Sequence, residues 1–367
     1  MKNDIGEIVS HFRIAGEFLG YEKVSTGHIN DSYIIKTSSS GDPGYFLQWI
    51  NTYIFKDVEG LMNNISHVTH HLANKLSENK ELDFTVLEII PCSDGRKYYQ
   101  DSTGLSWRLY RYIGNTHVYD VVENTGIAYE GGKAFGIFMS LLADLPAEKL
   151  GETIPDFHNM EKRLETFNLS LEADPLGRAN EISDETDFIR KRSAAMLNIQ
   201  SLVKAGLLPK RITHNDTKFN NILFDETEHA ICIVDLDTVM PGSILFDFGD
   251  AIRTGANTAN EDEKDLSEVG INLPIYEAYT RGFIKSTRHT LTEVEIDNLA
   301  FSARFMTFII GLRFLTDFVD GDPYFRTSYP QHNLDRARVQ FRLIEDMESK
   351  AEEMEAIVRQ AIERISI

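Results

Sequence analysis

The segment HNDTKFNNILF, which begins at His214, gathers residue types that could move a proton and hold a metal ion. Asp216 could accept the proton of an attacking hydroxyl group, and Lys218 could place its ammonium next to a transferred phosphoryl group. Asn221 and Asp235, the second of which ends an apolar run, could supply the hard oxygen ligands that Mg²⁺ prefers. Phosphoryl transfer requires this set of groups, so the segment predicts a site for that chemistry.

A second interpretation starts at the same aspartate. The stretch IVDLDTV also fits the Asp-x-Asp-x-Thr pattern of haloacid dehalogenase-like phosphatases, with Asp235 as nucleophile and Asp237 as acid/base. That chemistry needs later strands that carry a Ser or Thr, a Lys and an acidic pair, whereas the following residues read as mostly helical. It also leaves His214, Asp216 and Asn221 without a role. The phosphatase is therefore the less favoured alternative.

The elements before this segment are expected to form a small β-rich lobe. Strand-like runs cover residues 21–25, 33–37, 45–50, 83–90, 97–100 and 105–113. One helix interrupts them from Asp57 onward, because Leu61, Ile65, Val68 and Leu72 recur at helical spacing. We expect residues 1–113 to form this smaller lobe.

The character of the chain changes after Gly114. Helical patterns cover residues 126–145, 184–207, 275–284, 293–319 and 343–362, and two short β runs cover residues 222–224 and 230–235. A chain of 367 residues exceeds the size that one hydrophobic core serves well, so two lobes are expected. Residues 114–367 are predicted to be a catalytic and substrate-binding lobe.

The motif His-x-Asp-x-Lys-x-x-Asn over residues 214–221, followed by an apolar strand that ends in Asp235, resembles the catalytic and metal-binding loops of protein-kinase-like phosphotransferases. Asp235-Leu236-Asp237 stands where protein kinases have Asp-Phe-Gly, a departure shared with the aminoglycoside and choline phosphotransferase branch. Five stretches are similar to the N-acetylhexosamine 1-kinase family: STGHINDSY, NTYIFKDVEGLMNNI, ITHNDTKFNNILFDE, VDLDTVMPGSILFDFGDAIR and GLRFLTDFVDGDPYF.

The resemblance implies an α+β, bilobal, protein-kinase-like fold, with a small β-rich N-lobe containing one helix and a larger, mainly helical C-lobe. It implies ATP and Mg²⁺ as cofactors and phosphorylation of the anomeric hydroxyl of an N-acetylhexosamine to the sugar 1-phosphate. A kinase of another small hydroxyl substrate, such as another sugar, an amino alcohol or an aminoglycoside, remains open. So does a nucleotide-binding module that has lost catalysis.

The nucleotide is expected to contact two places in the smaller lobe. Thr26 and Gly27 lie in the loop STGHIN between two strands, where kinases have a glycine-rich loop over the phosphates, although only one glycine is present. Arg111, Tyr112 and Ile113 end the smaller lobe, where an adenine would bond to main-chain groups. These three residues are candidates by position rather than by side-chain type.

The strand YFLQWIN should carry the lysine that binds the α- and β-phosphates, but the position holds Gln48 or, with a shift of one residue, Trp49. Neither side chain is cationic, which is the main departure from the kinase pattern. Either another cation serves, with Lys36 and Lys218 as the candidates, or the phosphates rely on the metal ion. Glu59, on the next helix, is expected to be an exposed glutamate rather than an ion-pair partner.

The acceptor is expected to bind where GLRFLTDFVDGDPYF gathers Arg313, Asp317 and Tyr324. Carboxylates and a tyrosine suit a sugar, whose hydroxyls donate hydrogen bonds and whose ring faces stack on aromatic side chains. Arg313 and Asp317 are four residues apart, so an intrahelical ion pair is an equally good interpretation. His28 and Asn30 are expected to reach the same cleft from the smaller lobe.

The composition excludes several classes of partner. Lys and Arg number 37 against 57 Asp and Glu, a net charge of −20, so no nucleic-acid partner is expected. No run approaches the roughly 20 apolar residues of a membrane span, and no membrane partner is expected. The first residues lack a secretory signal, and only Cys92 and Cys232 occur, so we expect a cytoplasmic protein that binds ATP and a small sugar.

Overall fold

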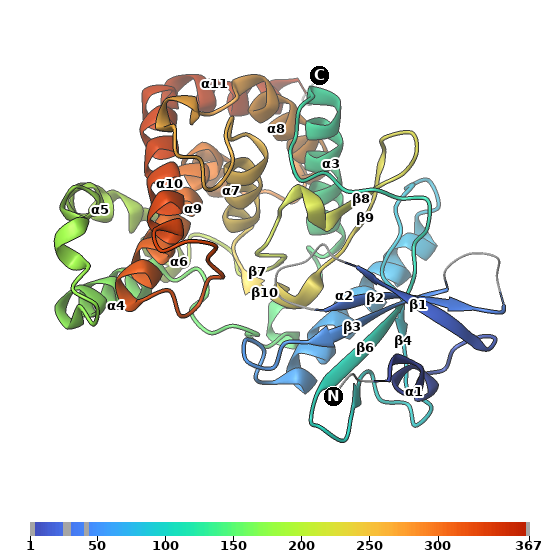
Figure 1. The fold of residues 1–367 in the computed structure, drawn as a ribbon. Helices are drawn as coiled ribbons and strands as arrows, with labels where there is room; N and C mark the ends of the chain where they lie inside the picture. The colour runs from blue at the N-terminus through green and yellow to red at the C-terminus, as the bar shows by residue number, and fades with distance from the viewer. Residues whose placement is uncertain (1–3, 25–30, 40–43, 365–367) are drawn as a thin grey trace.

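The computed structural model describes residues 4–24, 31–39 and 44–364. It has a smaller lobe built on a β-sheet and a larger, mainly helical lobe, which are joined near residues 112–124 (Figure 1). The fold is therefore the bilobal, kinase-like architecture that the sequence predicts. Thr26, Gly27, His28 and Asn30 lie outside the described residues, and the roles expected for them stay predictions.

The smaller lobe contains one antiparallel sheet in the order β1-β2-β3-β6-β4, with β5 paired to β6. The strands are β1 Phe18–Val24, β2 Ser32–Thr37, β3 Tyr45–Ile50, β4 Ile89–Ile90, β5 Tyr99–Gln100 and β6 Ser106–Arg111. The strand expected over residues 83–90 is wrong except for its last two residues. The amide of Thr85 donates to the carbonyl of Ile231 in the larger lobe, at 2.7 Å, rather than to a strand of the sheet.

Alternation along the strands decides which residues face the larger lobe. Gln48 on β3 lies directly opposite Arg108 on β6, and both share a face with Ile50, whose side chain packs into the core that α2 and the larger lobe form. Leu47 and Leu109 point the other way and pack with the short helix α1, Ile5–Ser10. The position that faces the larger lobe is therefore Gln48, and not Trp49.

The single long helix of the smaller lobe, α2, spans Val58–Glu78 and is capped by Asp57, whose carboxylate accepts from the Gly60 amide at 2.8 Å. Its apolar stripe is buried, as the spacing predicts. Glu59 is exposed, as expected. The buried Asn64 donates to the carbonyls of Gly151 and Val239, so this helix is tied to the larger lobe by main-chain hydrogen bonds.

The larger lobe holds the remaining α-helices and two small antiparallel strand pairs. The helices are α3 Thr125–Leu141, α4 Met160–Ala173, α5 Ser183–Met196, α6 Asn198–Lys204, α7 Ile244–Gly255, α8 Leu273–Thr287, α9 Glu293–Asp320, α10 His332–Ser349 and α11 Ala351–Glu363. The antiparallel pairs are β7 Arg211–Thr213 with β10 Met240–Gly242, and β8 Ile222–Phe224 with β9 Ala230–Ile233. The helical pattern of residues 184–207 breaks at Leu197, and the terminal pattern breaks at Lys350.

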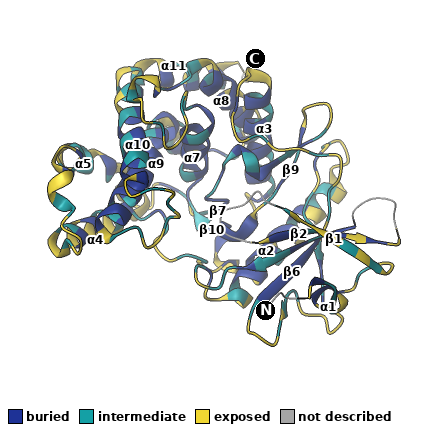
Figure 2. Cartoon of the chain, viewed as in Figure 1, coloured by how far each residue is buried: buried dark blue, intermediate teal, exposed yellow. Residues whose placement is uncertain are grey.

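The core of the larger lobe forms around α9, which packs against α7 and α10 and is dark over most of its length in Figure 2. This helix is long and apolar enough to cross a membrane by length and composition, contrary to the expectation that no stretch would qualify. However, 78% of its most apolar window is buried inside the protein, so its apolar character belongs to the core. A Cβ at Gly249 of α7 would lie 2.3 Å from the Ser302 carbonyl oxygen, so glycine permits the close approach of α7 and α9.

The topology decides against the phosphatase interpretation. After β10, the described chain from Ile244 to Arg364 forms helices and loops that contain only one isolated bridge, between Asn257 and Ile271. The later strands that would carry the remaining phosphatase residues are therefore missing from the described part of the chain. The reading of Asp235 as a phosphatase nucleophile is wrong.

Candidate active site

The loop after β7 is held in place by α7. The amides of His214 and Asn215 both donate to the carboxylate of Asp247, at 2.7 Å each, and the Thr217 hydroxyl donates to the Asp247 carbonyl at 2.6 Å. Burial raises the pKa of Asp247 to about 7, and the two amide donors oppose that rise. Asn215 has a φ of 65°, a left-handed conformation that asparagine tolerates better than most residues. These bonds fix the direction in which Asp216 leaves the loop.

The imidazole of His214 joins this loop to the strand that precedes Asp235. Its Nε2 lies 2.9 Å from the carbonyl oxygen of Val234, and its Nδ1 accepts from the amide of Asp216 at 3.3 Å. Burial lowers the pKa of His214, so the ring is neutral, with a proton on Nε2. The ring also packs edge-on to Phe135 and Phe138. His214 is thus a positioning residue for two carboxylates.

The structure brings Asp216, Lys218 and Asn221 together. The ammonium of Lys218 lies 3.1 Å from Oδ1 of Asp216, and the Asn221 amide nitrogen donates to the Asp216 carbonyl at 2.8 Å and to Oδ2 at 3.2 Å. Burial acts to raise the pKa of Asp216, but its neighbours, with Lys218 first among them, together hold the pKa below its usual range. Asp216 is therefore an ionised carboxylate at neutral pH, and its side chain is 27% exposed.

Asp235 follows β9 in the left-handed conformation, with φ 59° and ψ 58°, and its side chain is exposed. Desolvation by the surrounding protein raises the pKa of Asp235 to about 7, and the negative charges of Asp237 and Asp216 add to this rise. A divalent cation would relieve this repulsion. Because the Asn221 amide nitrogen is engaged by Asp216, its side-chain oxygen remains as a ligand.

These residues fit Mg²⁺ better than a metal held by protein side chains alone. Within the described ranges, no group of three or more His, Cys, Asp or Glu residues has the arrangement needed to hold a metal ion. Mg²⁺ is usually held by one or two carboxylates and completes its octahedron with water and phosphate oxygens. Asp235 and Asn221 supply such a partial set.

The structure adds a third cation to the two candidates for the missing cation on β3, whose roles stay predictions. Lys36 is exposed and lies 3.8 Å from Glu22, on the outer part of the sheet, while Lys218 is engaged by Asp216. The cation that faces Gln48 is Arg108, which the sequence reasoning missed. The signal was present in the alternation of SWRLYR, which places Arg108 on the face of its strand that carries Ser106 and Tyr110.

In the segment of residues 111–113, where an adenine was expected to bond to main-chain groups, two of the three amides already have partners. The amide of Arg111 donates to the Glu88 carbonyl at 2.9 Å, and the amide of Tyr112 donates to the Gly44 carbonyl at 3.2 Å. The Arg111 side chain is exposed and lies 3.2 Å from the Glu88 carboxylate. Within the described chain, the amide of Ile113 is the donor of this segment that stays open to an adenine.

Arg313 and Asp317 do not form the intrahelical ion pair that their spacing allows. The guanidinium of Arg313 lies over the rings of Phe157, Tyr324 and Phe325, at 4.9, 5.5 and 5.4 Å from their centroids. Burial lowers the pKa of Arg313, and no carboxylate of the described residues lies within ion-pair distance of it. Arg313 is therefore a half-buried cation in an aromatic setting.

Asp317 instead holds the loop that follows α9. Its Oδ1 accepts from the Tyr324 amide at 2.8 Å, and its Oδ2 accepts from the Phe325 amide and the Asn333 side chain at 2.9 Å each. These bonds place Tyr324, which is 48% exposed, beside Arg313. The structure therefore gives Asp317 a positioning contact to Tyr324, and direct contact of Asp317 with a substrate stays a prediction.

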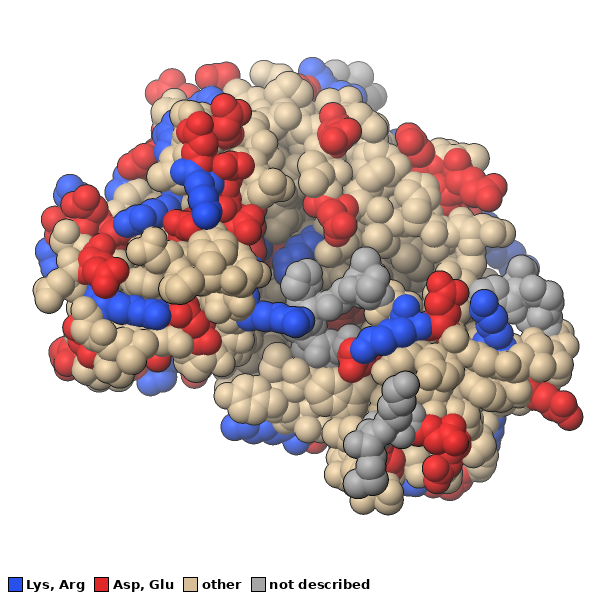
Figure 3. All heavy atoms as spheres, in the orientation of Figure 1, with Lys and Arg blue, Asp and Glu red and all other residues tan. Residues whose placement is uncertain are grey.

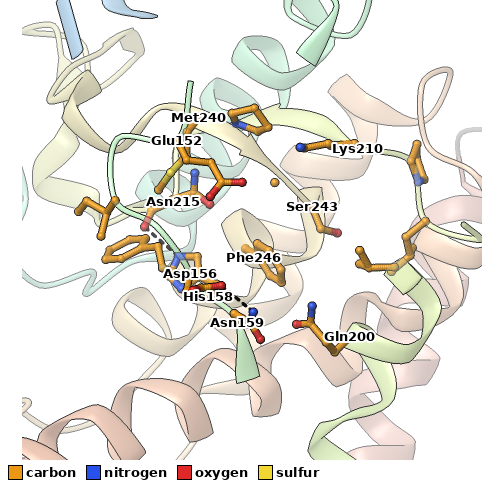
Figure 4. Close-up of a pocket in the computed structure, with 17 residues that line it drawn as sticks. Glu152, Asp156, His158, Asn159, Gln200, Lys210, Asn215, Met240, Ser243 and Phe246 are labelled. Carbon is orange, nitrogen blue, oxygen red and sulfur yellow. Dashed lines mark hydrogen bonds between the residues drawn. The ribbon is translucent and has the colours of Figure 1, made fainter. Parts of the chain in front are cut away.

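A cavity of about 380 Å³ borders the loop that begins at His214, on the side of Asn215 (Figure 4). His158 and Asn215 line it, and Nε2 of His158 lies 3.3 Å from the Asn215 carbonyl oxygen. Burial, followed by the charge of Arg313, lowers the pKa of His158 to about 3, so the ring is neutral. Asp216 does not line this cavity. His158 is part of the cavity wall and does not belong to the cluster of Asp216, Lys218 and Asn221.

Solved structures share this fold at low sequence identity. A spectinomycin phosphotransferase in complex with ADP and spectinomycin has a TM-score of 0.59 and 13% identity, over 95% of this chain and 97% of that one. A microcompartment-associated aminopropanol kinase has a TM-score of 0.56 and 13% identity, over 95% and 97%. An ethanolamine kinase of Plasmodium vivax has a TM-score of 0.55 and 14% identity, over 92% and 84%. At these identities the likeness concerns the fold.

The family follows from the sequence itself. The model of the phosphotransferase enzyme family, APH, matches residues 20–278, which include the sheet of the smaller lobe, the catalytic loop and the segment around Asp235. This match covers well over half of the chain. The chain belongs to the phosphotransferase enzyme family.

Proposed function

We propose that the protein transfers the γ-phosphoryl group of ATP to a hydroxyl group of a small sugar. The hydroxyl oxygen forms a bond to the γ-phosphorus, the bond from that phosphorus to the bridging oxygen breaks, and ADP leaves. Asp216 takes the proton of the hydroxyl group. The observation that carries this proposal is the ionised and partly exposed carboxylate of Asp216, which Lys218 and Asn221 hold next to Asp235.

Mg²⁺ fits the proposed reaction through Asn221 and Asp235. Asn221 and Asp235 would hold this ion, and it would neutralise phosphate charge that the acidic surroundings of Asp235 otherwise repel. The protein carries a net charge of −20, so the local cations Arg108 and Lys218 are needed as well. On the face drawn in Figure 3, acidic and basic side chains are interspersed over both lobes.

The basicity of Asp216 supports the anomeric hydroxyl as the acceptor. A carboxylate whose pKa lies below its usual range is a weak base, so it suits an acidic hydroxyl and a proton transfer that occurs late in a loose transition state. The anomeric hydroxyl is the most acidic hydroxyl of a reducing sugar. This reasoning favours phosphorylation at the 1-position over phosphorylation of an ordinary alcohol.

The charges near the acceptor side support a neutral substrate, and we propose an N-acetylhexosamine. Burial, followed by the charge of Arg313, lowers the pKa of Arg163 to about 10, so the two guanidinium groups lie near each other. Arg313 also acts on His158, which in turn lies within reach of the Asp216 charge. Two guanidinium groups disfavour a cationic amine, whereas the acetamido carbonyl of an N-acetylhexosamine accepts hydrogen bonds from a guanidinium.

A kinase of an amino alcohol or an aminoglycoside is the second candidate. The fold neighbours named as aminopropanol, ethanolamine and spectinomycin phosphotransferases favour it, since those acceptors are amines. Such an acceptor needs carboxylates, but Asp317 is engaged by its own loop. We therefore place this candidate second.

We further propose residues 1–113 as the nucleotide-binding lobe and residues 114–367 as the catalytic lobe.

The proposal is tested with purified protein, ATP and Mg²⁺ against a panel of N-acetylhexosamines, neutral hexoses, choline, ethanolamine and aminoglycosides. We expect ADP release with N-acetylhexosamines, and phosphorus NMR should show a phosphate on the anomeric oxygen. Phosphorylation of the amines alone would replace the sugar proposal by the second candidate. A lack of ADP release with every acceptor would favour a nucleotide-binding module without catalysis.

A further inference from the structure

Gln48 and Arg108 form a hydrogen-bonded pair across two neighbouring strands. They lie directly opposite each other on β3 and β6, and Oε1 of Gln48 accepts from Nε of Arg108 at 3.2 Å and from Nη2 at 3.0 Å. The Gln48 amide nitrogen donates to the Ser32 hydroxyl on β2 at 3.1 Å. Ser32 begins the strand that follows residues 25–30, the segment expected to cover the phosphates. Gln48 is thus held within the sheet by Ser32 on β2 and by Arg108 on β6.

The other side of the guanidinium reaches the larger lobe. Nη1 of Arg108 donates to the carboxylate of Asp237, two residues after Asp235, and both side chains are almost fully buried. Arg108 thus joins the sheet of the smaller lobe to the segment that carries Asp235.

A lysine at position 48 would place a second positive charge directly opposite Arg108. Directly opposite residues on antiparallel strands have Cα atoms about 4.5 to 5.5 Å apart, and like charges placed there destabilise a sheet. A neutral acceptor at position 48 instead holds the guanidinium through two hydrogen bonds. Gln48 and Arg108 are therefore compatible neighbours, and the positive charge of this face lies on β6, the strand next to β3.

We propose that Arg108 binds the phosphates of ATP in place of the usual strand lysine, with Gln48 and Asp237 as its positioning residues. The inference rests on the proposed function, because it assumes a nucleotide between the lobes. A guanidinium has five N–H donors, and the bonds to Gln48 and Asp237 engage three of them within the described chain. The side chain is 1% exposed, so under this proposal the phosphates reach the other two donors by displacing the groups that cover them. An arginine suits this position because it stays charged when buried.

The test compares the binding of ATP and of adenosine, which lacks phosphates, by isothermal titration calorimetry in the presence of Mg²⁺. We expect the wild-type protein to bind ATP more tightly than adenosine. In Arg108→Gln the affinity for ATP should fall about 10- to 100-fold, the loss expected for a charged hydrogen bond, with the affinity for adenosine unchanged. Arg96→Gln, which removes an exposed arginine of the same lobe, is the matched control and should change neither.

Two further variants guard against a folding defect, since Arg108→Gln removes the ion pair of the buried Asp237 carboxylate with Arg108. Arg108→Gln/Asp237→Asn removes both charges and should fold like the wild type in thermal unfolding while losing the same ATP affinity. Gln48→Lys/Arg108→Gln returns the charge to β3 and should restore part of that affinity.

The outcomes separate the two proposals. If the folded double variant Arg108→Gln/Asp237→Asn keeps the wild-type ATP affinity, or loses affinity for ATP and adenosine equally, Arg108 only connects the lobes and the inference is wrong. If the wild-type protein itself does not prefer ATP to adenosine, the proposed function fails, and the inference fails with it.

Discussion

The imidazole of His214 lies with its Nε2 atom 2.9 Å from the carbonyl oxygen of Val234, while its Nδ1 atom accepts from the amide of Asp216. One neutral ring therefore sets the separation of two chain segments that the sequence holds 20 residues apart. Asp216 makes one of these two contacts through its own amide, and Asp235 directly follows Val234, which makes the other. Their relative position depends on His214.

Replacement of His214 by leucine should weaken both folding and turnover. The variant leaves the Val234 carbonyl and the Asp216 amide without their buried partner, which costs about 1–3 kcal/mol of unfolding free energy for each unsatisfied group. We expect the turnover number to fall at least tenfold, because Asp216 and Asp235 lose their common support. Urea unfolding and steady-state kinetics measure the two effects. Full turnover in a folded variant would contradict the positioning role.

Replacement of Asp216 by asparagine should remove the base and preserve the fold. Asparagine has the same shape and keeps an oxygen that can face Lys218, so we expect a folded protein whose turnover number is lower by about 10²- to 10⁴-fold. The Michaelis constant for ATP should change little, because the residue acts on the acceptor. Asp265→Asn, on an exposed loop, is the control. Unchanged turnover would remove Asp216 as the base.

Replacement of Asp235 by asparagine should separate stability from activity. The Asp237 and Asp216 carboxylates raise the Asp235 pKa, so loss of its charge relieves repulsion and should raise the melting temperature of the protein without nucleotide. Mg²⁺-dependent use of ATP should fall by about 10² or more, since a metal ligand is lost. Thermal shift with and without Mg²⁺ and ATP checks both effects. A variant that is active and less stable would contradict the metal assignment.

The acid side of the stability profile should depend on His158. Its pKa is about 3 in the folded protein, whereas an unfolded histidine titrates near 6.5. Below pH 6.5 the unfolded chain therefore binds a proton that the folded chain does not, and stability falls as the pH is lowered. The contribution of this group reaches about 2 kcal/mol at pH 5. In His158→Gln the unfolding free energy should vary less between pH 6.5 and pH 4.5.

Urea unfolding at several pH values measures this effect. The comparison at pH 8, where neither state binds the proton, gives the intrinsic cost of the substitution. An identical pH profile for the two proteins would show that His158 does not carry the dependence.

Replacement of Asp317 by alanine should loosen the loop that places Tyr324. The variant loses three hydrogen bonds to a buried carboxylate, with a cost of about 1–3 kcal/mol or more. We expect the Michaelis constant for the acceptor to rise while that for ATP stays the same, because the loop borders the acceptor side. Asp320→Ala, an exposed neighbour on α9, is the control. Equal changes in both Michaelis constants would point to a general folding defect.

Local segments explain most of what could be predicted from the sequence. The residues from His214 to Asn221 are close together because the chain itself joins them, and β3 and α2 follow from alternation and helical spacing. The ends of elements were harder. The breaks at Leu197 and Lys350 interrupt patterns that continue on both sides, since an amphipathic stripe does not reveal a change in helix direction.

Which cation faces Gln48 depends on the tertiary structure. Gln48 and Arg108 are 60 residues apart, and they meet because β3 and β6 pair in one particular register. The same holds for Asp317, whose partners were set by the path of the loop after α9. Periodicity and motifs depend on neighbours along the chain, so the sequence alone determined the lobes and the catalytic loop. Contacts across strands depend on register and loop closure, so only the folded structure decided which charge faces which.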